Sequence, residues 1–64
     1  MTKEEKSKAN ITLKEARKAA KQLGYSKEIL NTLNNITIKL TDSYNSIIAL
    51  ITRQMINGRH SIPE

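Results

Sequence analysis

No glycine or proline interrupts the chain between Tyr25 and Asn57. These two residue types are the strongest local breakers of regular structure, so within this run no breaker marks where one element ends and the next begins. The 64 residues make one domain at most, and without cysteine no disulfide can support it. The apolar spacing on either side of Gly24 predicts an all-α protein: a helical corner of two short helices, followed by a long apolar C-terminal helix. We expect copies of the chain to associate as an oligomeric helical bundle.

The first helix of the corner is predicted to start at a capping-box sequence. Thr12 is followed three residues later by Glu15, the spacing at which each side chain satisfies a free backbone amide. An apolar face then runs to about Leu23, and Gly24 stands where a helix-ending residue with positive φ belongs. The expected organisation is a flexible basic tail over residues 1–10, a helical domain over residues 11–58 and a second tail over residues 59–64.

Ser26 is the predicted N-cap of the second helix, which should start near Lys27. Two patterns compete over where this helix ends. Residues 36–40 alternate apolar and polar side chains, as a short strand would, which indicates a break. A heptad rhythm that starts at Ile29 runs through the same segment, and it would make residues 27–56 one continuous helix. We favour the break.

The last helix is predicted over residues 42–56. Thr41 or Asp42 can cap its first turn, and Asn57 followed by Gly58 is a stop signal. This helix carries an apolar stripe that a 64-residue monomer can hardly cover, so we expect a homodimer. The expected interface residues are Leu40, Ile47, Ile48, Leu50, Ile51, Met55 and Ile56.

The charge of the chain points to an acidic partner. The net charge is +5 and the pI is near 9.8, which favours nucleic acid or an acidic protein. Eight of the eleven lysines and arginines lie at or before Lys27, whereas most apolar residues lie after it. This polarised charge fits nucleic acid better than a protein adaptor.

An enzyme is not expected, because so small a chain has little interior for a pocket with converging polar groups. No cofactor or metal is expected, since cysteine is absent and His60 has only Glu64 within helical reach. No stretch approaches the roughly 18 apolar residues of a membrane span. The charged N-terminus also lacks the apolar segment of a secretory signal. We therefore expect a cytoplasmic protein without a membrane partner.

Residues 16–35 contain a spaced pattern with functional content. Ala20, Gly24 and Tyr25 stand at the fifth, ninth and tenth positions of this block, with apolar residues at the supporting positions. The block resembles the helix-turn-helix motif of bacterial and phage repressors, in which the small residue lets the second helix cross closely and the glycine makes the turn. It departs from the motif because its second helix has no arginine. The chain also has room for fewer helices than the usual repressor domain.

The resemblance implies that the second helix reads DNA in the major groove while the first holds the backbone. The nucleic-acid-binding residues that it implies are Lys14, Arg17, Lys18, Lys21, Lys27, Asn31, Thr32 and Asn35. The expected function is a small DNA-binding transcriptional regulator, of the kind carried by a phage or another mobile element. The alternative is a small helical adaptor or inhibitor that binds another regulatory protein through its isoleucine-rich last helix.

Overall fold

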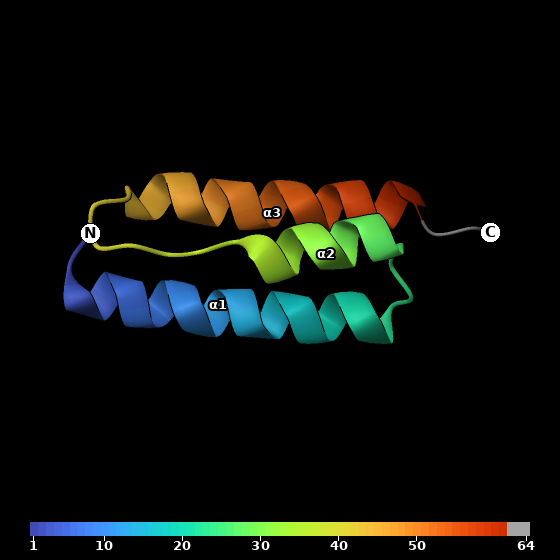
Figure 1. Ribbon diagram of the computed structural model, residues 1–64, viewed down its shortest axis with the longest axis horizontal. Helices are drawn as coiled ribbons and strands as arrows, with labels where there is room; N and C mark the ends of the chain where they lie inside the picture. The colour runs from blue at the N-terminus through green and yellow to red at the C-terminus, as the bar shows by residue number, and fades with distance from the viewer. Residues whose placement is uncertain (62–64) are drawn as a thin grey trace.

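The computed structural model describes residues 1–61 and contains three α-helices, with no strand in that range. α1 spans Lys3–Gln22, α2 spans Lys27–Asn35 and α3 spans Tyr44–Ser61. The helices pack as an elongated bundle of 40 × 16 × 14 Å (Figure 1). The all-α prediction is confirmed. Within the described residues, no helix has the length and apolar character to cross a membrane.

α1 begins much earlier than predicted. The hydroxyl of Thr2 accepts a hydrogen bond from the Glu5 amide at 3.1 Å, and the Glu5 carboxylate accepts one from the Thr2 amide at 2.9 Å. Thr12, the predicted cap, lies inside the helix, and its hydroxyl donates to a carbonyl one turn earlier. The predicted flexible tail over residues 1–10 is wrong, because a second capping box with the same spacing, Thr2 and Glu5, starts the helix ten residues before Thr12. Buried Ala9 then extends the packing face of α1.

α1 ends as predicted, at a left-handed glycine. Gly24 has φ +75°, and Leu23 is the C-cap. The Gly24 amide donates to the Lys21 carbonyl at 3.3 Å, and the Tyr25 amide donates to the Ala20 carbonyl at 3.0 Å. These two bonds form a Schellman motif, which satisfies the last carbonyls of the helix. A residue with a Cβ in this conformation would cost roughly 1–2 kcal/mol.

α2 also starts as predicted, at Lys27. The hydroxyl of Ser26 accepts a hydrogen bond from the Ile29 amide at 3.4 Å, so this serine is the N-cap. The helix ends at Asn35, because Ile36 turns to extended geometry with φ −67° and ψ 123°. The predicted break is therefore confirmed and the continuous helix is excluded. The strand pattern that followed it forms extended chain without a sheet partner among the described residues.

The chain returns along α1 in two pieces, which together form the return limb, residues 27–43 (Figure 1). The first piece is α2, and the second is the segment over residues 36–43, called the extended segment, which is extended as far as Lys39 and then makes a turn closed by a hydrogen bond from the Asp42 amide to the Lys39 carbonyl at 3.0 Å. At the far end of the bundle the N-terminal ammonium of Met1 donates to the carbonyls of Leu40 and Asp42, the latter at 2.9 Å. α3 then runs in the same direction as α1, so the return limb connects two parallel helices.

α3 continues past its predicted end. The pair Asn57 and Gly58, expected as a stop signal, lies inside the helix, which extends to Ser61. The ring of Tyr25 packs against the backbone here: a Cβ at Gly58 would overlap its Cδ2 and Cε2 atoms. The glycine therefore permits a close approach, and it does not end the helix. The tail predicted over residues 59–64 is helical to this point, and residues 62–64 lie outside the described part of the chain.

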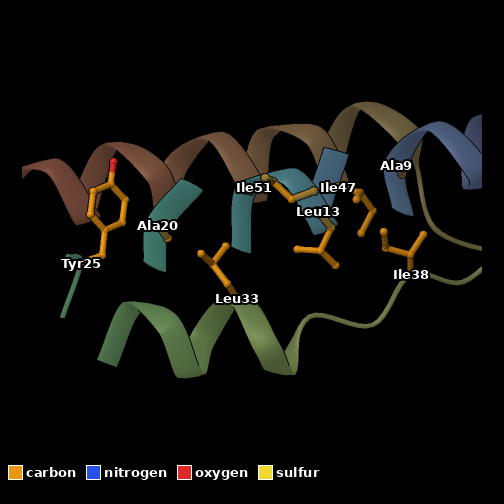
Figure 2. Close-up of a cluster of buried hydrophobic side chains, with 9 residues drawn as sticks. Ala9, Leu13, Ala20, Tyr25, Leu33, Ile38, Ile47 and Ile51 are labelled. Atoms are coloured by element: carbon orange, nitrogen blue, oxygen red, sulfur yellow. The ribbon is translucent and has the colours of Figure 1, made fainter. Parts of the chain in front are cut away.

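Buried apolar side chains from the helices, from the turn between α1 and α2 and from the extended segment meet along the axis of the bundle (Figure 2). They are Ala9, Leu13, Ala16, Ala20, Tyr25, Leu33, Ile38, Ile47 and Ile51. Alanines on α1 leave room for α2 and α3 to approach. Leu33 of α2 is the largest side chain that is completely buried.

The apolar stripe of α3 is largely covered within one chain. Ile47 and Ile51 are buried, while Ile48 and Met55 are half-buried. The premise that a monomer cannot cover this stripe is wrong for the buried pair, because the longer α1 and the return limb pack over them. The exposed members of the predicted interface are Leu40 at 42%, Leu50 at 39% and Ile56 at 51%.

Candidate nucleic-acid interface

A groove of about 630 Å³ lies between α1 and α2. Its lining combines four cationic side chains, two amides and one leucine: Arg17, Lys18, Lys21, Lys27, Leu30, Asn31 and Asn34. We call this the α1–α2 groove. No carboxylate lines it, so nothing in its wall neutralises the positive charge. A concave surface of one charge sign concentrates ligands of the opposite sign, and this one is suited to an anion.

The turn at Gly24 brings the charges of the groove together. It reverses the chain, so that Lys21 near the end of α1 and Lys27 at the start of α2 line the same groove. Lys18 lies one turn before Lys21 on α1. The two amides are three residues apart on α2, a spacing that places side chains on the same side of a helix. Cations from one helix therefore face amides from the other.

Arg17 differs from the three lysines because its guanidinium is occupied. Its Nε donates to the Leu33 carbonyl at 3.0 Å, and its Nη2 donates to the carbonyls of Asn34 and Ile36, each at 3.3 Å. These carbonyls belong to the end of α2, where the regular helical hydrogen bonds run out; the Leu33 carbonyl also accepts the Ile36 amide at 3.4 Å. A cation at a helix C-terminus is also favoured by the helix dipole. Arg17 thus links α1 to the end of α2. The sequence predicts only a phosphate contact for this residue and not this structural role.

Five of the eight residues predicted to bind nucleic acid line the groove, namely Arg17, Lys18, Lys21, Lys27 and Asn31. The other three, Lys14, Thr32 and Asn35, are exposed but lie outside its lining. Sequence reasoning missed Leu30 and Asn34. Asn34 could have been predicted from the sequence, because it lies about one helical turn after Asn31, which is among the predicted residues.

The structure has two helices joined at a glycine turn at the place where the resemblance was noted, and the resemblance itself stays a prediction. In the structure α2 folds back beside α1 (Figure 1), and the arginine of α1 holds its far end. The first and second turns of α2 contribute Lys27 and Asn31 to the wall of the groove. Reading of bases by α2 stays a prediction.

α3 offers a much smaller hollow on its outer face. This hollow has a volume of about 330 Å³ and is lined by Ser46, Ala49, Leu50 and Arg53. It contains one cation and one large apolar side chain, so it matches neither an anion site nor an extended apolar docking face. Of these two hollows, the α1–α2 groove is therefore the one with the chemistry of an anion site.

Residues 1–61 contain no group of three or more side chains that could hold a metal ion. His60 is exposed in the last turn of α3. Glu64, which the sequence places within helical reach of it, lies outside the described residues.

Comparisons of the chain with protein-family models, with curated proteins and with solved structures give no match. Function is therefore inferred from the chemistry of the groove itself.

Proposed function

We propose that this protein binds DNA through the α1–α2 groove. The observation that supports this proposal is the composition of the groove wall: four cations and two amides without a carboxylate. Arginine, lysine and asparagine side chains are common donors to phosphate oxygens in protein–DNA complexes. The net charge of +5 adds a long-range attraction for a polyanion. Control of transcription is the role that such binding would serve.

The alternative adaptor function would use the apolar face of α3. That face is weakened as a docking surface because its central residues, Ile47 and Ile51, pack inside the protein's own core. Leu50 and Ile56 remain exposed, but they differ by six positions, which places them about 120° apart around a helix with 3.6 residues per turn. The groove is therefore the better candidate for partner binding.

The test is a titration of a labelled DNA duplex at about 50 and 200 mM salt, conditions across which phosphate contacts change affinity steeply. The informative variant replaces both Lys18 and Lys21 by alanine. The matched control replaces Lys3 and Lys8 by alanine. These two lysines are exposed on the same helix but lie outside the groove, and their replacement removes the same amount of charge.

A plot of log affinity against log salt concentration has a negative slope, and each phosphate contact contributes about 0.9 to its magnitude. Loss of two contacts should therefore make the slope shallower by about 1.8. The affinity gap between the parent and the groove variant should then shrink about tenfold over that salt range. The control variant should keep a slope close to that of the parent. No binding by the parent at the lower salt, or equal losses in both variants, would contradict the proposal.

A further inference from the structure

We infer that the α1–α2 groove receives the sugar–phosphate backbone of one DNA strand and does not read base edges. This inference rests on the proposed DNA binding and specifies which part of the DNA the groove contacts. It follows from the shape of the groove, from the positions of its donors and from the contacts of Arg17.

The shape of the groove matches the ridges of a duplex. In B-DNA the base edges lie at the bottom of grooves, and the major groove is about 12 Å wide and about 8.5 Å deep. A protein element that reads them must therefore project into the DNA. Asn31 and Asn34 instead line a concave space between two helices. A concave site accepts a convex ligand, and the convex features of a duplex are its two backbones.

The donors of the groove also suit phosphate oxygens. Lys18 and Lys21 supply ammonium groups from α1, and on the opposite wall α2 supplies the ammonium group of Lys27 and the amide N–H groups of the two asparagines. The carboxylate of Glu28, the nearest acidic residue to Lys27 in the sequence, is not part of the lining. A strand passing between the helices would meet donors on both sides and no repulsive charge.

Arg17 fixes the geometry that this contact needs. Its guanidinium binds three carbonyls at the end of α2, and this holds the part of the helix that carries Asn34 against α1. α2 is also anchored by the completely buried Leu33. A helix held on two sides presents its amides to the groove. It is not free to swing into the major groove on its own.

The test compares several duplexes of equal length and unrelated sequence at one salt concentration, with the parent and three single variants. Asn31→Ala and Asn34→Ala remove donors from the groove. Asn10→Ala is the matched control, because this asparagine is exposed on α1 and lies outside the lining. Circular dichroism at the titration temperature confirms that each variant is folded.

Each groove variant should weaken binding about tenfold, the scale of a lost hydrogen bond to a charged group. The loss should agree within about twofold on every duplex, since backbone contacts carry no sequence information. The Asn10→Ala control should bind like the parent. A loss confined to one sequence would show base reading and overturn the inference while leaving DNA binding intact. Full affinity of both groove variants would also overturn it. A parent that binds no duplex would overturn the proposed function and this inference together.

Discussion

The two halves of the return limb cover the same helix by different means. α2 covers the C-terminal half of α1, and it is held by its Ser26 cap, by Arg17 and by the completely buried Leu33. The extended segment over residues 36–43 covers the N-terminal half of α1 with one buried side chain, Ile38. Its backbone is held at the far end by the N-terminal ammonium.

The difference shows what each conformation provides. A helix advances about 1.5 Å per residue and can present a fixed face of side chains, whereas an extended chain advances about 3.3 Å per residue. The extended half therefore spans its distance with few residues but presents few side chains, and Lys39 is its only cation. The helical half carries the groove. Binding chemistry is thus confined to the half of the limb that is helical.

The largest expected effect comes from truncating the buried side chains of the two halves. Leu33→Ala should lower the free energy of unfolding by about 2–5 kcal/mol, because it leaves a cavity at a completely buried site. Ile38→Ala should cost less, because the extended segment has no helical hydrogen bonds and relaxes more easily into the space. Urea denaturation followed by circular dichroism measures both. A larger loss of unfolding free energy for Ile38→Ala than for Leu33→Ala would contradict the stated difference between the two halves.

A second substitution probes the joint where the limb begins. Gly58→Ala should destabilise the protein by about 1–3 kcal/mol, because the new Cβ would overlap the ring of Tyr25. Helix propensity alone predicts the opposite sign, a gain of about 1 kcal/mol. Asn57→Ala is the control, since the neighbouring residue is exposed on the same helix. The melting temperature decides the sign, and a rise for Gly58→Ala would refute the close packing.

The smallest expected effect concerns the cap that precedes α1. Thr2→Ala should cost about 1 kcal/mol through loss of the capping box. Met1 adjoins this cap, and its ammonium group holds the carbonyls of Leu40 and Asp42. Loss of the cap should therefore raise the hydrogen-exchange rates of the backbone amides more in residues 36–43 than in α2. Thr12→Ala, at the position first predicted as the cap, should change stability by less than about 0.5 kcal/mol, as a substitution in the middle of a helix surface does. Equal costs at the two threonines would contradict the assigned start of α1.

The parts of the fold that could be predicted from sequence are those with short-range causes. Gly24 and Ser26 were identified because a left-handed cap and an N-cap act within a few residues. The start of α1 was misplaced because two capping boxes have the same spacing. The sequence predicts a helix end at Gly58 because nothing near it in the chain reveals the ring of Tyr25.

The candidate site shows the same division. The groove lysines could be selected from their spacing on predicted helices, and Lys18 and Lys21 do line it. The role of Arg17 could not be found, because it depends on where the carbonyls at the end of α2 come to rest. The sequence reasoning places Ile47 and Ile51 at an interface because it takes the apolar stripe as too large for a 64-residue monomer to cover, whereas both are buried within one chain.

The parallel arrangement of α1 and α3 has a topological consequence. Met1 lies at one end of the long axis, and the last turn of α3 lies at the other (Figure 1). A loop joining these points would have to recross the 18 residues of α3, a distance of about 27 Å, which needs at least about eight fully extended residues. A circular permutant of this fold with a shorter linker could therefore not form without disrupting the bundle. Copies fused head to tail would instead be joined at opposite ends of the long axis.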